Sequence, residues 1–185
     1  METDRELLNS ARGRNKDALI QIFDHYASAL YYYAMRLIRD PVIADHIVGD
    51  VFTKFLEQIW SGKGPKTNLR SYLYQMTYHL IIDQVRSSRR SAPLEVANSL
   101  VDDVHSSSSS LENQMLLEVV LKVIQNELTD DQRHVIVLRF FEEYSLKETA
   151  EILGKQVDNI KMLQNRAIAK LRKNLGLSGT ETALA

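Results

Sequence analysis

The stretch from Ser145 to Leu171, SLKETAEILGKQVDNIKMLQNRAIAKL, constrains the fold of this chain more than any other. Ser145 and Glu148 have the spacing of a capping box, in which each side chain bonds a backbone N–H at a helix start. Gly154 follows the last apolar residue of that helix, where glycine takes a left-handed backbone without steric cost. The pattern predicts two short helices joined by a tight turn, the arrangement of a DNA-binding helix-turn-helix.

The second of these helices is predicted to have one apolar and one polar side. Its apolar residues recur at a spacing near 3.6, at Ile160, Leu163, Ala167 and Leu171. The polar side includes amides and cations, which can contact base edges and phosphates in a major groove. Its members are Gln156, Asp158, Asn159, Lys161, Met162, Asn165 and Arg166. The alternative is an ordinary solvated helix face, but the consistent offsets of Ala150, Gly154 and the capping box favour DNA binding.

Composition narrows the class of protein. The chain has 185 residues, of which 44% are hydrophobic and 25% charged, so it has the content of one globular domain or two small ones. It has no cysteine, which excludes a disulfide framework, thiolate metal sites and cysteine nucleophiles. No signal peptide and no apolar run of about 20 residues is found, so we expect a cytoplasmic protein without membrane insertion.

The sign of the charge alternates along the chain. The net charge is only -1, but residues 61–92 carry +5 and residues 132–185 carry +3. Residues 93–131, between these basic segments, carry -7. The distribution indicates two separate places that contact phosphate.

Apolar spacing predicts four helices in the first half, over residues 3–11, 17–37, 41–60 and 69–88. Asp40 and Pro41 mark the start of the third, as a cap and a first-turn proline. We expect Tyr31, Tyr32 and Tyr33 to serve packing, because consecutive residues on a helix point in different directions. On the third helix the predicted buried stripe is Ile43, Ile47, Val48, Val51, Phe52, Phe55 and Ile59. Its other side is either a partner surface or a plain solvated face.

Residues 61–68, SGKGPKTN, are predicted to form a loop with two lysines. Thr67 or Asn68 is placed to cap the following helix. That helix ends in a basic cluster, residues 86–90, of which Arg86 suits the helix dipole and Arg89 and Arg90 are available for phosphate.

Residues 92–110 contain a proline, paired acids and five consecutive serines, which predicts a flexible acidic linker. Helical spacing resumes at Leu111. The residues from Thr129 to Gln132 form a second capping box, which is expected to open a helix through Phe140. Residues 177–185 are predicted to be a small polar tail.

No pattern of catalytic residues stands out. The five histidines are scattered and form no set with metal-ligand spacing, and Gly62 and Gly64 lack the lysine-hydroxyl signature of a phosphate loop. No serine sits in a nucleophile elbow. We therefore expect a binding protein without cofactor or metal, and not an enzyme.

Two blocks of the sequence together resemble a bacterial sigma factor of the extracytoplasmic-function (ECF) class of the sigma-70 family. They are LRSYLYQMTYHLIIDQVRSSRR and LTDDQRHVIVLRFFEEYSLKETAEILGKQVDNIKMLQNRAIAKLRK. The resemblance implies an all-α fold of two small helical domains, region 2 within residues 1–91 and region 4 within residues 111–176. It implies that the chain binds core RNA polymerase, recognises the −35 and −10 promoter elements and promotes DNA opening.

The resemblance also implies roles for particular residues and partners. The helix over residues 41–60 would dock on the clamp helices of the largest polymerase subunit, through Asp45, His46, Gly49, Asp50 and Phe52. The −10 element would be captured by Lys63, Lys66, Asn68, Tyr72, Arg86, Arg89 and Arg90. The polar side of the helix over residues 156–170 would read the −35 duplex. Further partners would be the flap of the second-largest subunit and an anti-sigma factor.

Two other functions remain compatible with the residues. One is a helical transcription regulator that binds duplex DNA unaided through its C-terminal domain and senses or dimerises through its first half. The other is an α-helical interaction protein, whose binding would lack the steep salt dependence of DNA affinity.

Overall fold

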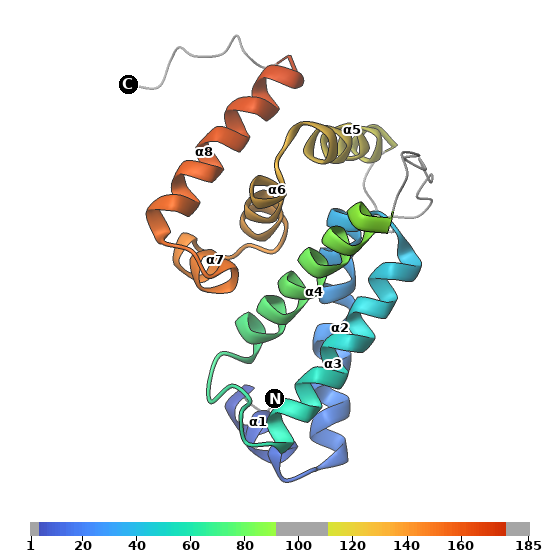
Figure 1. The fold of residues 1–185 in the computed structure, drawn as a ribbon, viewed down its shortest axis with the longest axis vertical. Helices are drawn as coiled ribbons and strands as arrows, with labels where there is room; N and C mark the ends of the chain where they lie inside the picture. The colour runs from blue at the N-terminus through green and yellow to red at the C-terminus, as the bar shows by residue number, and fades with distance from the viewer. Residues whose placement is uncertain (1–3, 92–110, 177–185) are drawn as a thin grey trace. The chain divides into compact units, whose positions relative to one another are not determined.

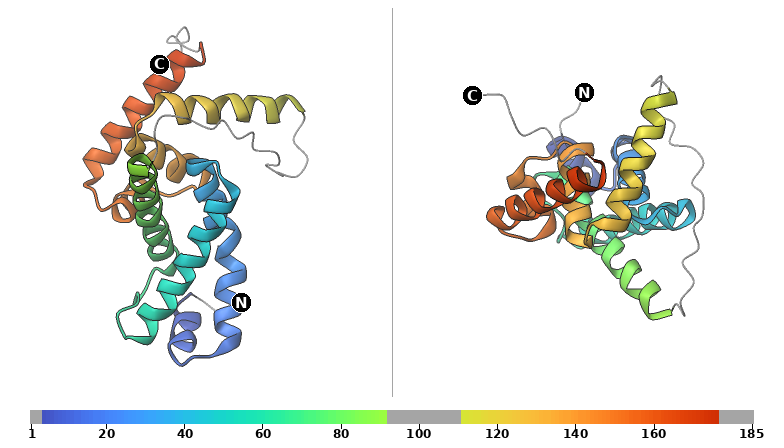
Figure 2. Two further views of the ribbon diagram at one scale, coloured as in Figure 1. Left: turned by 45° about the vertical axis from the view of Figure 1, so that its right-hand side comes forward. Right: turned by 90° about the horizontal axis from the view of Figure 1, so that it is seen from above.

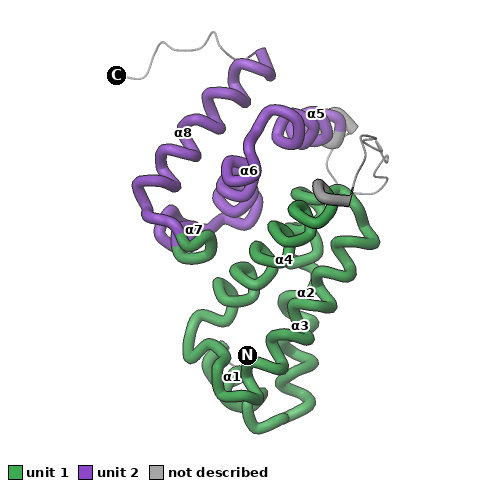
Figure 3. Tube along the Cα trace, viewed as in Figure 1, with its two compact units in different colours: residues 1–101, 151–154 green, residues 102–150, 155–185 purple. Residues whose placement is uncertain are grey.

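The computed structural model describes residues 4–91 and 111–176, and of residues 89–91 and 111–114 only the backbone. Within these ranges the chain is helical and contains no strand, which confirms the predicted all-α fold. Two compact units divide it, residues 1–101 with 151–154 and residues 102–150 with 155–185 (Figure 3). The predicted linker, 92–110, and the predicted tail, 177–185, lie outside the described residues.

The first unit is built from α1 (Asp4–Arg12), α2 (Lys16–Ile38), α3 (Pro41–Trp60) and α4 (Leu69–Ser91). The long helices α2, α3 and α4 all pack against one another, and the short α1 lies at one end of them (Figure 1, Figure 2). These bounds agree with the four predicted helices to within a few residues.

Polar caps define where two of these helices begin. The Asn15 side chain accepts a hydrogen bond from the Ala18 N–H at 3.0 Å and starts α2. The Asp40 carboxylate accepts from the backbone N–H groups of Val42 and Ile43, at 2.9 and 3.0 Å. This confirms the predicted start of α3, because a cap satisfies backbone donors that have no partner inside the helix.

The apolar stripes of α2, α3 and α4 meet in one core. The Tyr33 and Tyr74 rings pack at its centre with centroids 5.2 Å apart, and both side chains are buried. Tyr32, the neighbour of Tyr33, is exposed, as expected for consecutive positions on a helix. Other fully buried side chains of this core are Ile22, Leu30, Val51, Phe55, Leu73 and Ile81.

Apolar and polar contacts together fix α1 to the unit. Leu8 and Ala11 are completely buried, and the Tyr26 hydroxyl of α2 donates to both carboxylate oxygens of Asp4 at 2.8 Å. Burial, followed by the hydrogen bond and charge of Asp4, raises the pKa of Tyr26.

The loop over residues 61–68 is held tightly against the end of α3. The backbone N–H groups of Lys63 and Gly64 both donate to the Gln58 carbonyl, at 2.9 and 3.0 Å. A Cβ at Gly64 would lie 2.6 Å from Ile59 Cγ2 and 3.0 Å from Ile59 Cα. Asn68 closes the loop with a left-handed φ of 55° and accepts at 3.4 Å from the Ser71 N–H. Asn68 is therefore the residue that caps α4.

The second half of the chain contains α5 (Leu111–Glu127), α6 (Asp130–Ile136), the π-helix η1 (Val137–Phe141), α7 (Leu146–Leu153) and α8 (Val157–Asn174). All of them belong to the second unit except the end of α7, residues 151–153, which is grouped with the first. Helix α8 packs on α5 and α6, and the contact centres on the buried residues Ile124, Leu128, Ile136 and Ala167. The Thr129 capping box is present, with Thr129 N–H donating to Gln132 Oε1 at 3.1 Å.

The helix expected from the Thr129 box through Phe140 is present, but its last turn is a π-helix. At Val137 the chain widens into η1, where the Glu142 N–H reaches the Val137 carbonyl five residues back, at 3.1 Å. Val137 and Leu138 are buried, and Phe140 is exposed. Short π-helical turns of this kind are rare and often lie beside functional sites.

Only the C-terminal half of α5 is packed into the second unit. Ile124 is buried and Val120 and Leu121 are partly buried against the core. Met115, Leu116 and Val119 belong to the same predicted helix but are exposed. No helix in the described part of the chain is long and apolar enough to cross a membrane.

Acid should destabilise the second unit through His134. This side chain is 2% exposed, and burial lowers its pKa to about 3, with Arg133 and Lys155 acting in the same direction against Asp130. The unfolded state binds the proton more tightly, so this contribution to stability is complete above about pH 6.5 and is lost as the pH falls toward 3. At pH 5 we expect about 2 kcal/mol less stability than at pH 7 from this residue alone.

Urea unfolding followed by circular dichroism at both pH values measures this loss. The variant His134→Gln has no titrating group at this position, so its stability should change less between the two pH values. An equal change in wild type and variant would show that His134 is not responsible.

Two glycines of the first unit should respond in opposite ways to alanine. Gly64→Ala places a methyl group against the Ile59 backbone, so we expect a loss of about 1–3 kcal/mol. Gly49 lies exposed in α3 with nothing within 4 Å of an added Cβ, and Gly49→Ala should gain about 0.5–1 kcal/mol. Emission from Trp60, the only tryptophan of the chain, reports unfolding of this unit directly. A Gly64→Ala protein as stable as wild type would contradict the tight packing of the loop.

Candidate nucleic-acid interface

The helix-turn-helix predicted from the sequence is present in α7 and α8. The Ser145 N–H donates to Glu148 Oε2 at 2.8 Å, and the Glu148 N–H donates to Ser145 Oγ at 3.2 Å, which completes the capping box. Gly154 has a φ of 62°, and the Lys155 N–H reaches back to the Ala150 carbonyl at 2.9 Å. The glycine conformation thus ends α7 and redirects the chain into α8.

Helix α8 turns its polar side to solvent because its other side is anchored. Ile160 and Ala167 are completely buried, and Leu163 and Leu171 are partly buried. The seven predicted −35 residues are all exposed on this helix or at its cap: Gln156, Asp158, Asn159, Lys161, Met162, Asn165 and Arg166. The structure brings them together on one element, in the form that a major groove accepts.

Arg139 of η1 is hydrogen-bonded to α8, a contact that was not predicted from the sequence. Its Nε donates to Gln164 Oε1 at 3.0 Å, and its guanidinium also donates to the Tyr144 carbonyl. Lys155, in the turn before α8, pairs with Asp131 of α6 at 3.0 Å. Neither pair has a short-range spacing in the sequence, so nothing in the pattern of residues indicated it.

The predicted −10 residues form two groups. Lys63, Lys66 and Asn68 are exposed in the loop, and Tyr72 follows in the first turn of α4, where burial raises its pKa. Arg86 is exposed near the other end of α4, about 21 Å along the helix from Tyr72 at 1.5 Å per residue. Arg89 and Arg90 lie in α4, but their side chains are outside the described residues.

One face of α4 connects these two groups. Positions 72, 79 and 86 are spaced by seven residues, which places them on the same side of the helix. His79 is exposed between Tyr72 and Arg86. Tyr72, His79 and Arg86 therefore lie along one side of α4, between the loop and the basic end of the helix.

Of the five predicted polymerase-binding residues, four are exposed and one is buried. Asp45, His46, Gly49 and Asp50 are exposed on α3, where two carboxylates dominate the charge. Phe52 is buried, and its ring packs on that of Phe23 with centroids 4.8 Å apart. Phe52 thus supports this face from inside, and the exposed aromatic ring at this position belongs to Phe23.

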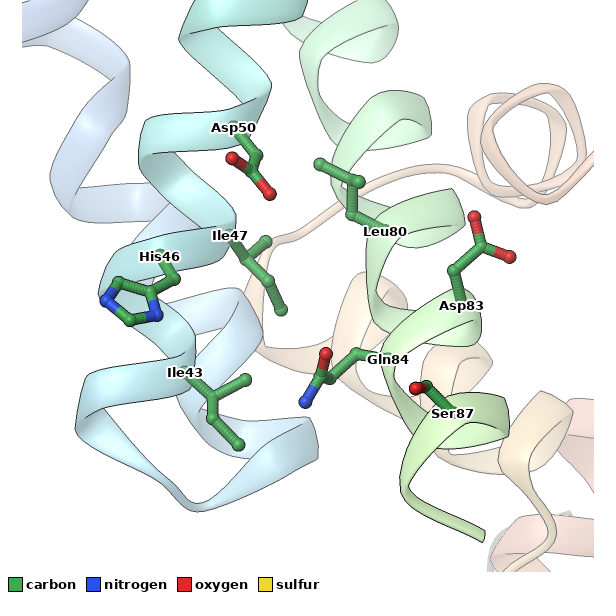
Figure 4. Close-up of a pocket in the computed structure, with 8 residues that line it drawn as sticks. All are labelled: Ile43, His46, Ile47, Asp50, Leu80, Asp83, Gln84 and Ser87. Atoms are coloured by element: carbon green, nitrogen blue, oxygen red, sulfur yellow. The ribbon is translucent and has the colours of Figure 1, made fainter. Parts of the chain in front are cut away.

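A shallow pocket of about 300 Å³ lies between α3 and α4. Figure 4 shows Leu80 and Gln84 pointing from α4 toward α3, where Ile47 and Asp50 face them. His46 also lines it, so the pocket borders the exposed acidic face. Within the described ranges, no group of three histidine or acidic side chains is placed to hold a metal ion.

A second cluster that the sequence did not indicate lies where α1 meets the loop. The indole Nε1 of Trp60 donates to the Ala11 carbonyl at 3.3 Å, and the Arg14 guanidinium lies over the ring, 5.2 Å from its centroid. The Arg12 guanidinium donates to the Pro65 carbonyl in the loop. Only the three-dimensional fold brings these residues together, because about 50 positions separate them in the sequence.

Comparison with known families agrees with this division of the chain. Residues 22–91 match "Sigma-70 region 2", and residues 126–173 match "Sigma-70, region 4". The first match covers α3, the loop and α4, and the second covers the helix-turn-helix.

Individual proteins of this kind are similar along most of the chain. The RNA polymerase sigma-E factor of Streptomyces avermitilis is 32% identical, over 80% of this chain and 79% of its own length. The ECF RNA polymerase sigma factor BldN of Streptomyces coelicolor is 28% identical, and the match covers 92% of this chain but only 65% of that protein.

Among solved structures, the fold is similar to that of the sigma factor RpoE from Bartonella quintana, in complex with the anti-sigma factor NepR. The TM-score is 0.69 at 22% identity, covering 85% of this chain and 96% of that one. With both regions matched in order and a relative above 30% identity, the chain belongs to the sigma-70 family, as an RNA polymerase sigma factor of the ECF class.

Proposed function

We propose that the two units divide promoter recognition between them, region 2 within residues 1–91 and region 4 within residues 111–176. Region 4 reads the −35 duplex with the exposed side of α8, and region 2 captures the −10 element with the loop and α4. The observation that carries this proposal is α8 itself. Its buried Ile160 and Ala167 turn cations and amides outward on the second helix of a helix-turn-helix.

The exposed face of α3 is the proposed contact to core RNA polymerase. Asp45 and Asp50 give it a negative charge, and His46 and Gly49 complete it. Its docking partner in this proposal is the clamp helices of the largest subunit, with a further contact from region 4 to the flap of the second-largest subunit. Complementary charge would speed the encounter and fix its orientation.

The action is binding and not catalysis. The protein joins polymerase to promoter, and the free energy of its DNA contacts favours the opened duplex, while polymerase performs the chemistry. This needs neither cofactor nor metal, and it takes place in the cytoplasm, where the polymerase works.

An anti-sigma factor is a further proposed partner. The structurally similar RpoE of Bartonella quintana was solved in complex with such a protein. An anti-sigma factor that covers the α3 face or the α8 face would keep this chain from polymerase or from DNA.

Transcription with purified core RNA polymerase tests the function directly. We expect specific transcripts from some promoters of a genomic library only when this protein is added. Core polymerase that is active with another sigma factor, but neither binds nor responds to this one, would favour the rival transcription regulator. That rival would also bind promoter duplex without polymerase.

Substitutions on α8 test the −35 contact. Lys161→Ala and Arg166→Ala should each lower transcription from a responsive promoter by about 5- to 100-fold, since one base or phosphate contact contributes about 1–3 kcal/mol. Lys173→Ala removes the same charge in the last turn of α8 and should change little. Equal effects of all three would indicate general electrostatics in place of groove reading.

Charge reversal on α3 tests the polymerase contact. Asp50→Lys should weaken core binding by tenfold or more, because it turns a favourable charge pair into a repulsive one. Asp24→Lys, exposed on α2, is the matched control and should bind as wild type does. Affinity is measured by titrating core polymerase with fluorescently labelled protein, and unchanged affinity of Asp50→Lys would contradict this contact.

A further inference from the structure

Trp60 is a large aromatic side chain in an unusual setting. It is the last residue of α3 and the only tryptophan of the chain. Its side chain is 43% exposed. Its Nε1 donates to the Ala11 carbonyl at 3.3 Å, so its polar edge already has a partner. The ring is therefore held in one orientation while much of it faces solvent.

One cation lies over this ring, and the two chain segments that meet beside it are basic. The Arg14 guanidinium lies over the ring, 5.2 Å from its centroid. The turn RGRNK, residues 12–16, contributes Arg12, Arg14 and Lys16, and the loop over residues 61–68 contributes Lys63 and Lys66. Neither segment contains aspartate or glutamate. The site thus combines an exposed aromatic ring with a guanidinium over it, beside two basic segments.

Hydrogen bonds also join the segment over residues 12–16 to the loop and fix its own conformation. Arg12 donates to the Pro65 carbonyl, and the Arg14 N–H donates to the Ala11 carbonyl at 3.0 Å, which fixes the left-handed φ of 60° at Arg14. The aromatic ring and its cations thus stand beside the loop in a preformed arrangement.

Unpaired nucleotides bind proteins through this combination of groups. Bases stack on aromatic side chains regardless of their sequence, and arginine and lysine hold the phosphates between them. Duplex DNA cannot use such a site, because its bases are already stacked on each other. A protein partner anchored on this ring would need an apolar surface around it, which the two basic segments do not provide.

We propose that Trp60 and Arg14 form a stacking site for one unpaired base of the opened promoter strand, beside the bases that the loop captures. In this arrangement the base stacks on the part of the indole that Arg14 leaves exposed, and Arg14 neutralises the adjoining phosphate. Lys63 and Lys66 continue the phosphate path along the loop. The proposal rests on the proposed function, to which it adds a contact outside the predicted −10 residues.

The single tryptophan makes the test direct. The full chain at low salt is titrated with a single-stranded oligonucleotide of mixed sequence, and in parallel with the same strand annealed to its complement. Stacking on the indole should quench Trp60 emission saturably with the single strand and far less with the duplex. Binding of a labelled single strand without a change in Trp60 emission would overturn the proposal. So would the absence of single-strand binding, since a preformed site needs no other protein.

Variants separate a nucleotide contact from a structural role. Arg14→Ala and Trp60→Ala should weaken single-strand binding by about 5- to 50-fold, measured by anisotropy of the labelled strand. Trp60→Tyr keeps a stacking ring and should recover most of the affinity. Lys122→Ala removes one exposed charge from α5 and should change affinity less than about twofold.

The thermal stability of each variant shows whether weaker binding results from partial unfolding. If Arg14→Ala lowers the thermal stability of the protein but binds the single strand as wild type does, Arg14 only fastens α1 to α3 and the proposal fails. If wild-type protein supports transcription with core polymerase and both alanine variants open promoters equally well, this site is wrong while the sigma-factor function stands.

Discussion

The complete burial of Ile160 and Ala167 sets the rotation of α8 about its own axis, and the proposed DNA-reading surface depends on that rotation. A helix turns by about 100° per residue, so fixing two positions seven residues apart fixes every position between them. Arg139 adds a polar restraint through Gln164 on a neighbouring side of the helix. The exposed amides and cations are thus presented in a defined register before any DNA arrives.

The same coupling of a buried stripe to an exposed face operates in the first unit. Val51, Phe55 and Ile59 hold α3 against α2 and α4, which leaves Asp45, His46, Gly49 and Asp50 outside. Gly49 has no packing reason to be glycine, since an added Cβ would meet nothing within 4 Å. A helix-interior glycine costs stability relative to alanine, so its presence on this face is consistent with a partner that approaches the backbone closely.

Local interactions explain how much of this molecule could be predicted from its sequence. The Ser145 and Thr129 capping boxes, the Asp40 cap and the Gly154 turn each involve residues at most five positions apart, and all were predicted. The apolar stripes likewise depend only on the helical repeat. These features fix the ends of the helices and the faces that they bury.

The features that escaped prediction depend on residues brought together by the fold. Arg139 reaches Gln164 across 25 positions, and Trp60 reaches Ala11 across 49, so no spacing rule connects them. The π-helix at Val137 breaks a pattern that local propensity alone would continue as α-helix. Phe52 was predicted both in the buried stripe of α3 and in the polymerase-binding motif; its burial is confirmed, and only its ring partner Phe23 was not foreseen.

The loop over residues 61–68 illustrates why such long-range contacts matter for function. Its own sequence, with two glycines and a proline, would allow many conformations. The Gln58 carbonyl, the Ile59 backbone and the Arg12 guanidinium select one of them. A loop ordered in advance loses less conformational entropy when it binds a strand, so more of each contact energy remains for holding the promoter open. Under the proposed function, the short α1 helix would therefore contribute to DNA capture through Arg12 and Ala11, although neither residue is among the predicted −10 contacts.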